Sequence, residues 1–554
     1  MVRKNLQRPN LLREENEMVT ENHYRWDFIG LSTDDKPTPA TSERVVDGST
    51  YYTSDDSKLY VFCKDQWYEK IPIGGGGGGG GDEPAGDGVI ETYDPETGEI
   101  TGSGFGSTAG KVYMLDRDTH SYIEQPVSKW TSTKITLSTP LDLEHLEGTT
   151  SIVALLDNGT YSTKLLVTGD ISVTGWGKVY FYGGDGQIDT ATLSSQSDYE
   201  KLRFNAVGSV TIGSKTFYCT DIVGLQFGSS FNLTQILNNY LDYCYNLNQP
   251  IVFPDSVTNM SNQQILANCS YLNQPVVLPK NLTSIGQSFM NHCTSFNQKI
   301  VLPTTLTTIG NSFMNECFSF NQPLTIPASV TSLGNSFLYK CYSFNSALEI
   351  KSTCDIGTSF LGLCYAFNQP IIIPDGVTAI GANFLGGDYA FNQPITLSNT
   401  LSSIGGSFGA SGSSDGLYSF NQPLTLPASL RTIGERFLQF AGSFNYPLVI
   451  PEGVTYIGKN FMQYAYGFSS KLTVPSTVSS VGTYFMQSCY GLTEVEVNTT
   501  TSPTDSYTLS TTQADTKMYG IGITLTGTGA SSWKAALADS SSSPYRKLID
   551  GTAE

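Results

Sequence analysis

The sequence predicts a mainly β, multidomain chain with an N-terminal β-meander, a β-sandwich-like spacer and a C-terminal repeat solenoid. With 554 residues, the chain is far longer than one compact core usually requires. It holds 55 Gly, 31 Tyr and 28 Phe but only 15% charged residues, which favours strands and turns over long charged helices. A motif that returns about every 24 residues after residue 240 predicts the solenoid.

The N-terminal region, residues 1–73, is predicted to be a polar arm followed by a small β module. Residues 1–25 carry charges throughout, and short β-like runs separated by turn signals lie between Trp26 and Tyr68. Eight consecutive glycines follow from Gly74 to Gly81, and such a run cannot hold one backbone conformation. We therefore expect a flexible linker over residues 74–111.

Residues 112–228 are predicted to form a β-rich spacer domain. Short β-like segments, for example residues 151–156 and 178–182, alternate there with Asn-Gly and Gly-Asp turns. No motif in this region indicates a chemistry.

The repeat that follows, over residues 229–497, combines an Asn with an apolar strand, a Pro and a later Ile-Gly and Phe. The Asn recurs at Asn248, Asn273, Asn297, Asn321, Asn345, Asn368, Asn392, Asn421 and Asn445. Such a period means one coil per repeat, with each coil stacking its apolar side on the next. Alternation along Leu324–Ile326 directs the first and third side chains inward. The Asn is expected to bond backbone groups of its own and neighbouring coils.

A second register of the repeat holds phenylalanine and predicts a continuous core stripe. Its members are Phe289, Phe313, Phe337, Phe360, Phe384, Phe408, Phe437, Phe461 and Phe485. One coil carries a five-residue insertion that ends near Gly416. Because the other coils close without it, the segment Gly409–Gly416 is a candidate for recognition.

Six cysteines share the position four residues before the Asn, and we predict that they are reduced thiols in the core. They are Cys244, Cys269, Cys293, Cys317, Cys341 and Cys364. Later coils hold Asp388, Leu417, Ala441, Ala465 and Cys489 there, so the position mostly takes a modest apolar residue. The alternative is a metal or disulfide ladder.

The position after each cysteine carries an aromatic stripe, which is the candidate binding surface. It holds Tyr245, Phe318, Tyr342, Tyr365, Tyr389, Tyr418, Tyr466 and Tyr490, with Ser270, Thr294 and Gly442 as interruptions. Rigid tyrosines suit sugar faces or protein partners, so we predict that Tyr342, Tyr365, Tyr389, Tyr418 and Tyr466 bind a ligand. In the alternative, the rings are structural cover, and binding uses outward strand positions such as Thr325, Ile372 and Thr396.

Two segments resemble known families. FIGLSTDDKPT, which begins at Phe28, and VDGSTYYTSDDSKLYVFCKDQWYEK, which ends at Lys70, resemble a segment of bacteriophage head-fibre and tail-fibre proteins near their virion-attached end. The alternative there is a generic β module of a secreted or surface protein. IPASVTSLGNSF at 326–337, followed by Cys341, resembles the BspA-like leucine-rich repeats, as does VTNM at 257–260 beside LNQP. The resemblance implies an adhesion or interaction protein without enzymatic activity.

The C-terminal sequence GTGASSWKAALADSSSSPYRKLID at 527–550 also resembles the BspA-like family. In that family a short helix follows the last coil. The resemblance therefore predicts a C-terminal cap over residues 498–554.

Charge and residue usage disfavour several classes of function. A net charge of −19 repels phosphate backbones, so no nucleic-acid partner is expected. No apolar run has the length of a signal peptide or a membrane span, so we expect no membrane insertion. The four histidines are scattered, so we expect no catalytic residue, metal or cofactor. Two carboxylate pairs, Asp116 with Asp118 and Asp142 with Glu144, could bind calcium but fit a solvated surface better.

Together these observations predict a non-enzymatic virion structural protein of a bacteriophage, either a head fibre or capsid decoration or a tail fibre. Its N-terminal region would contact capsid or tail proteins, and its solenoid would bind a host-surface protein or glycan. We expect assembly in the host cytoplasm, a place on the virion surface and a homotrimer. The alternative is a bacterial or protist cell-surface adhesin. A glycan-active enzyme, with residues 112–228 as its catalytic part, is the least favoured hypothesis.

Overall fold

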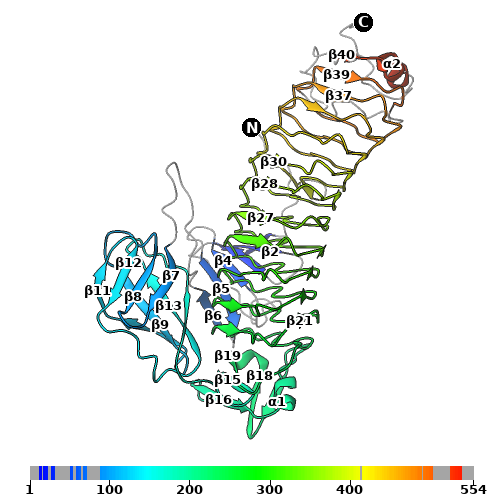
Figure 1. Cartoon of the computed structure of the whole chain (residues 1–554). Coiled ribbons are helices and arrows are strands. Elements are labelled where there is room, and N and C mark those ends of the chain that lie inside the picture. The colour runs from blue at the N-terminus through cyan, green and yellow to red at the C-terminus, as the bar shows by residue number, and fades with distance from the viewer. Residues whose placement is uncertain are drawn as a thin grey trace.

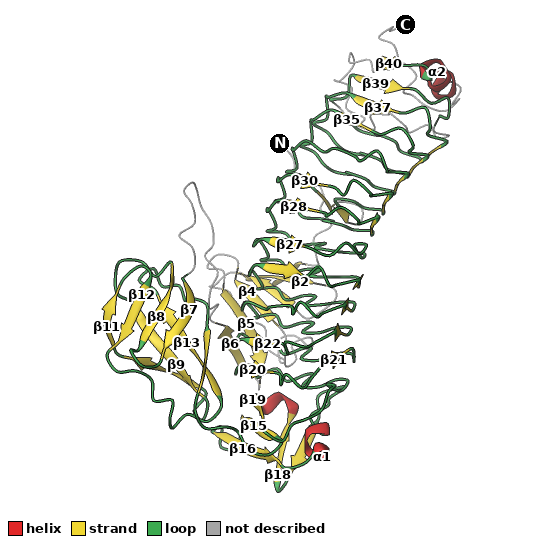
Figure 2. Ribbon diagram, viewed as in Figure 1, coloured by secondary structure: helices red, strands yellow, loops and turns green. Residues whose placement is uncertain are grey.

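The computed structural model describes residues 88–411, 415–489, 491–502 and 524–538, together with six strands between residues 11 and 70. Figure 1 shows the coils of the C-terminal half stacked along one axis, with a separate β domain beside the first coils. The α-helices of the described residues are α1 (Gln196–Glu200) and α2 (Ala530–Ala538), and strands and loops make up nearly all the rest (Figure 2). The predicted mainly β, multidomain fold with a C-terminal solenoid is confirmed.

The N-terminal strands form one six-stranded sheet in chain order. They are β1 (Leu11–Glu14), β2 (Glu17–Asn22), β3 (Asp27–Gly30), β4 (Thr50–Thr53), β5 (Lys58–Cys63) and β6 (Gln66–Lys70). Strands β3 and β4 pair in parallel, whereas the other neighbours are antiparallel. Two strands thus lie in the predicted polar arm, and the parallel step departs from a simple meander. The eight glycines lie outside the described residues.

A β-sandwich of two four-stranded sheets begins at residue 88. One sheet contains, in order, β11 (Val127–Trp130), β12 (Lys134–Leu137), β8 (Glu99–Ser103) and β7 (Val89–Asp94). The other contains β10 (Ser121–Gln125), β9 (Lys111–Asp116), β13 (Thr149–Leu155) and β14 (Leu165–Thr168). Ile100, Phe105, Val112 and Ile152 are fully buried between them.

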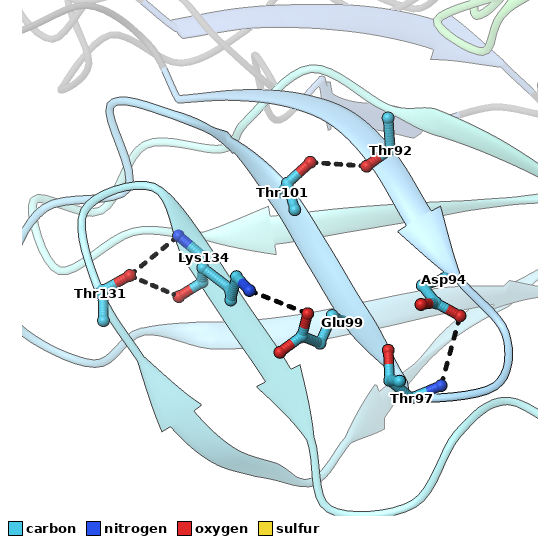
Figure 3. A network of polar contacts seen from close by, with 7 residues as sticks. All are labelled: Thr92, Asp94, Thr97, Glu99, Thr101, Thr131 and Lys134. Carbon is cyan, nitrogen blue, oxygen red and sulfur yellow. Dashed lines mark hydrogen bonds and ion pairs between the residues drawn. The ribbon is translucent and has the colours of Figure 1, made fainter.

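This sandwich changes one predicted boundary, because β7 and β8 lie inside the stretch 74–111 that was expected to be a linker. The hairpin closes where the Gly98 N–H donates to the Asp94 carbonyl at 2.9 Å and the Glu96 N–H donates to Asp94 Oδ1 at 2.9 Å. Polar pairs then join the strands on the solvent side, as Figure 3 shows. Lys134 Nζ lies 2.9 Å from Glu99 Oε2, and the hydroxyls of Thr92 and Thr101 are in contact.

The second half of the predicted spacer forms the N-terminal cap of the solenoid. It contains β15 (Gly177–Tyr182), β16 (Ile188–Leu193), β17 (Ser209–Ile212), β18 (Lys215–Tyr218), the 3₁₀ turn Cys219–Asp221 and β19 (Ile222–Phe227). Side chains of the cap join the solenoid core, and the ring centroids of Tyr199 and Tyr240 are 4.5 Å apart. The predicted spacer over 112–228 therefore comprises most of a sandwich together with a cap. A cap is needed because the first coil of a solenoid has an open apolar end with no preceding coil to cover it.

Each solenoid coil contributes short strands that pair in parallel with those of its neighbours. One set is β20 (Ile251–Val252), β22 (Val276–Val277), β25 (Leu324–Ile326), β27 (Leu348–Ile350), β28 (Ile371–Ile372), β30 (Ile395–Thr396), β35 (Leu448–Val449) and β37 (Leu472–Val474). The other set is β21 (Asn259–Met260), β23 (Ser284–Ile285), β24 (Thr308–Ile309), β26 (Ser332–Leu333), β29 (Ala379–Ile380), β31 (Ser403–Ile404), β34 (Thr432–Ile433), β36 (Tyr456–Ile457) and β38 (Ser480–Val481). Leu324 and Ile326 are buried and Thr325 is exposed, as the alternation predicted.

Three ladders run through the stacked coils. The predicted phenylalanine stripe is confirmed: the rings are at most 1% exposed, and successive rings from Phe289 to Phe485 stack with centroids 5.2–6.0 Å apart. Each Asn accepts a backbone N–H from the next coil, as between Asn321 Oδ1 and the Asn345 nitrogen at 2.8 Å. The glycine after each Ile allows close contact, because a Cβ on Gly310 would lie 2.5 Å from the Gly286 carbonyl carbon.

The C-terminal end of the solenoid is covered by β39 (Glu494–Val497), β40 (Thr524–Thr526) and α2. Trp533 of α2 is fully buried, and its ring packs edge-on against Phe485 at 5.5 Å. Its indole N–H donates to the Thr501 carbonyl at 2.9 Å. The short helix that the resemblance predicted after the last coil is therefore observed, and it covers the last apolar coil.

Candidate binding surface

One edge of the solenoid has an unusual backbone that positions the aromatic stripe. In each coil, alternate residues adopt positive φ, as in Ser336 (57°), Leu338 (53°) and Lys340 (60°). Their N–H groups point alternately to the next and the preceding coil. The Ser336 N–H donates to the Thr358 carbonyl of the next coil at 2.7 Å, and the Leu338 N–H donates to the Phe313 carbonyl of the preceding coil at 3.1 Å. These bonds between coils stabilise a conformation that isolated residues disfavour.

The predicted stripe forms a stacked ladder along this edge. Phe318 and Tyr342 have centroids 4.7 Å apart, Tyr342 and Tyr365 5.0 Å, Tyr365 and Tyr389 5.3 Å, and Tyr389 and Tyr418 5.6 Å. The planes of these pairs differ by 4–29°. The ladder is at the surface: Tyr365 is 38% exposed and Tyr418 37%, and Tyr342 and Tyr389 are half-buried.

Stacking limits how this ladder can bind. Each inner ring has a neighbouring ring over both faces, so a ligand reaches ring edges along the ladder and ring faces only where a neighbour is missing. Binding and structural cover, the two hypotheses made from the sequence, both stay predictions. The rings cover the coil edge, and they also present rigid aromatic area to solvent.

The ladder is interrupted once between Tyr418 and Tyr466, where Gly442 occupies the stripe position. Here the sequence interpretation missed two rings, because Phe440 and Tyr464 lie two residues before the stripe register, at positive-φ positions. They stack on each other at 4.9 Å and flank the interruption. Tyr466 is 43% exposed. Of the other stripe members, Tyr245 lies near Tyr243 at 6.1 Å, and Tyr490 lies outside the described residues.

The cysteine register is buried and forms a ladder of thiols. Seven of the thiols donate to backbone carbonyls, as in Cys317 Sγ to Met290 O and Cys341 Sγ to Met314 O, both at 3.2 Å. Burial raises the pKa of Cys489 to about 12 and raises the pKa values of Cys244, Cys269, Cys317 and Cys364 well above their usual value. The nine cysteines from Cys219 to Cys489 are free thiols. These thiols are therefore packed as predicted, and they fill core positions.

The remaining polar candidates have structural partners. Asp116 Oδ1 accepts the Asp118 N–H at 2.9 Å, and Asp142 lies 2.8 Å from His145 Nδ1. Among the described residues, no group of three or more His, Cys, Asp or Glu side chains is placed to hold a metal ion. No helix in the described ranges has the length and apolar character needed to cross a bilayer.

The insertion lies beside the ladder. Its ends pair as a short hairpin, β32 (Ala410–Ser411) with β33 (Asp415–Gly416), and residues 412–414 lie outside the described residues. The outward strand positions lie on a different surface, where Thr325, Ile372 and Thr396 are all exposed. The candidate positions thus separate into an aromatic edge and a strand face.

Comparisons with known proteins agree with the coil geometry. The sequence profile of the family described as BspA type leucine-rich repeat region matches six copies in residues 186–273, 262–392 and 417–530. The chain therefore belongs to the BspA-type leucine-rich-repeat family. No curated protein sequence matches it.

Two solved structures are similar at low identity. A leucine-rich repeat protein from Bacteroides ovatus ATCC 8483 is 17% identical, with 64% of this chain and 76% of that chain covered and a TM-score of 0.38. A leucine-rich cell surface protein from Faecalibacterium prausnitzii A2-165 is 16% identical, with 59% and 95% covered and a TM-score of 0.28.

Proposed function

We propose that the chain is a non-enzymatic adhesion protein that binds a partner through the aromatic edge of its solenoid. The observation that carries the proposal is the stacked ladder from Phe318 to Tyr418. Coils with Ser270 or Thr294 at the same position close without an aromatic ring, so the solenoid core does not require the ladder. Membership of the BspA-type family supports a binding role.

The physical properties of the ladder favour recognition. Stacked tyrosines are already ordered, so binding costs little side-chain entropy, and each ring combines apolar area with a polar hydroxyl. Aromatic anchors carry much of the binding energy in protein interfaces. The partner that we propose is a surface protein or glycan of a cell.

A triple variant tests this proposal. Tyr342→Ala, Tyr365→Ala and Tyr389→Ala together are expected to weaken attachment to cells or to a glycan array by about tenfold or more, as loss of interface anchors does. The matched control is Thr325→Ala, Ile372→Ala and Thr396→Ala on the strand face, which should leave attachment unchanged. Loss of binding only in the control would transfer the binding role to the strand face.

We further propose that the protein is displayed on a bacteriophage virion as a homotrimer. The N-terminal segment from Phe28 to Lys70 supports this proposal through its resemblance to phage fibre proteins, as does the glycine run that follows it. In a symmetric trimer three solenoids would bind with added avidity. The competing proposal is display on a bacterial or protist cell surface, with the same binding edge.

Truncation separates the two settings. A chain that starts after Gly81 retains the described sandwich, cap and solenoid, so it should stay folded but fail to join phage particles. Particle incorporation is measured by immunoblotting purified virions, and oligomeric mass by light scattering of the full chain. Normal incorporation of the truncated chain, or a monomeric full chain, would contradict the respective proposal.

A further inference from the structure

The interruption at Gly442 is a gap of one ring in a regular aromatic ladder. The backbone does not break there: the Ser443 N–H donates to the Tyr418 carbonyl at 3.2 Å, and the Gly467 N–H donates to the Gly442 carbonyl at 2.9 Å. The local turn is also preserved. The Gly442 N–H donates to the carbonyl of the residue two positions earlier at 2.8 Å. The N–H groups of Tyr418 and Tyr466 make the equivalent hydrogen bonds at 2.9 Å. Only the side chain is missing.

Aromatic rings enclose the gap. Tyr418 and Tyr466 lie one coil before and one coil after Gly442, and Phe440 and Tyr464 flank it. The ring centroids of Phe440 and Tyr418 are 6.4 Å apart, and those of Tyr464 and Tyr466 are 5.9 Å apart. The Phe440 and Tyr464 rings stack with their centroids 4.9 Å apart. The four rings thus form a continuous series from Tyr418 through Phe440 and Tyr464 to Tyr466, which passes beside Gly442.

A side chain can begin at Gly442 without a clash. A Cβ added there would meet its nearest neighbours, Tyr466 Cδ2 and the Phe440 carbonyl oxygen, at 3.9 and 4.0 Å, which are ordinary contact distances. Gly442 is half-exposed, whereas Ser270 and Thr294, which also interrupt the stripe, are buried. Of these three interruptions, only the one at Gly442 is accessible from solvent.

We propose that this gap, which we call the Gly442 notch, binds an aromatic side chain of a protein partner. The rungs from Phe318 to Tyr418 are aromatic rings at centroid spacings of 4.7–5.6 Å, and Gly442 occupies the next rung of the same repeat, so a ring is what this ladder places there. The surroundings of the notch are aromatic rings, which suit a neutral apolar ring. An aromatic anchor in a preformed pocket is a common centre of a protein interface. The proposal rests on the proposed function, since it identifies where on the aromatic edge a partner inserts.

Small probes test the notch without knowledge of the partner. The full chain is titrated with 4-methylphenol, which mimics a tyrosine side chain, and separately with methyl β-glucoside, while ligand-observed NMR measures binding. We expect saturable binding of 4-methylphenol with a dissociation constant on the order of 1 mM, which is reasonable for so small a ligand, and no binding of the glucoside.

Gly442→Tyr is the decisive variant because it fills the gap with the residue that the ladder uses. Since φ at Gly442 is not positive and its turn matches those of Tyr418 and Tyr466, the variant should fold with a thermal midpoint equal to or above that of wild type. It should lose 4-methylphenol binding at least tenfold, while Gly442→Ala should keep most of it. Equal binding by wild type and Gly442→Tyr, or binding of the glucoside alone, would overturn the proposal.

The outcome is distinguishable from failure of the proposed function. Cell attachment of the Tyr342, Tyr365 and Tyr389 triple variant tests the edge as a whole, whereas the probe titration tests the notch alone. If the triple variant loses attachment while Gly442→Tyr keeps both attachment and probe binding, the edge binds elsewhere and the notch proposal fails.

Discussion

At the residue scale, the glycine after each Ile shows how one atom sets the spacing of the solenoid. The backbones of successive coils touch at these glycines, and the atoms nearest to an added Cβ on Gly334 are the Asn311 nitrogen and the Gly310 carbonyl carbon, both at 2.5 Å. Backbone atoms cannot rotate away as side-chain ends can. The sequence shows that Gly recurs there, but only the structure shows that close contact between coils, rather than a turn, is the reason.

Gly334→Ala is therefore expected to lower the free energy of unfolding by roughly 1–3 kcal/mol, the usual cost of overpacking. The matched control is Gly184→Ala in the cap, where an added Cβ has nothing within 4 Å and φ is not positive. Urea unfolding followed by circular dichroism measures both. Equal stability of the two variants would show that the coils separate at little cost.

At the element scale, most of the solenoid could be predicted because its period is visible in the residues themselves. The Asn ladder, the Phe stripe and the alternation of Leu324–Ile326 all follow from position within the repeat. The cap over 177–227 could not be separated from the sandwich, because neither repeats and both have short strands. Phe440 and Tyr464 were missed because sequence spacing does not reveal that positive φ directs their side chains beside the stripe.

Ring stacking also changes the expected cost of altering the aromatic edge. Exposed truncations usually cost within about 0.5 kcal/mol, but Tyr342, Tyr365 and Tyr389 each stack on both neighbours, and such pairs add roughly 0.5–1.5 kcal/mol. We expect the triple alanine variant to lose a few kcal/mol and remain folded. Phe337→Ala, in the fully buried stripe, should alone cost about 3–5 kcal/mol.

Thermal unfolding of the triple variant and of Phe337→Ala checks this ordering. A conservative control is Tyr342→Phe with Tyr365→Phe and Tyr389→Phe, which keeps the stack and should lose much less stability than the triple alanine variant. A triple alanine variant that is as stable as wild type would show that the stack contributes nothing. One that fails to fold would show that the rings are mainly structural cover.

At the scale of the whole molecule, the sandwich docks on the first coils through a polar junction. Glutamines that follow the repeated Asn contact the sandwich: Gln274 Oε1 accepts the Ser151 hydroxyl at 2.8 Å, and Gln249 Nε2 donates to the Arg117 carbonyl at 2.9 Å. Later coils keep the same motif with no sandwich over it. The motif that the sequence presents as a uniform repeat thus serves as an interface in its first copies.

The junction also concentrates positive charge. Arg117 is buried with its guanidinium 4.8 Å from the centroid of the Tyr180 ring, and Lys164 is buried with its ammonium 5.5 Å from that of Tyr122. His120 lies beside them, and burial together with these two cations lowers the pKa of His120 to about 4. A proton on His120 would place a third positive charge in the junction.

The pKa of His120 predicts that docking weakens in acid. An exposed histidine has a pKa near about 6.5. Between about pH 6.5 and 4, His120 therefore binds a proton in the undocked state but not in the docked state. The contribution of neutral His120 to the free energy of docking is therefore fully present above about pH 6.5. It decreases as the pH drops towards 4 and is constant below that, with a total loss of up to about 3 kcal/mol. Asp242, whose pKa burial raises to about 6, changes in the opposite sense over much of this range, so wild type alone does not isolate the histidine.

The comparison with His120→Asn isolates it. His120 has a φ of 53°, which asparagine tolerates better than most residues, so this variant should preserve the turn while removing the titrating group. Hydrogen exchange of the β13 amides and small-angle X-ray scattering, both recorded from pH 7 to 4.5, report whether the sandwich stays docked. We expect protection factors, which correct for the slower intrinsic exchange in acid, to fall in wild type across this range and to fall much less in the variant. The same acid-induced change in both proteins would assign it to the carboxyl groups instead.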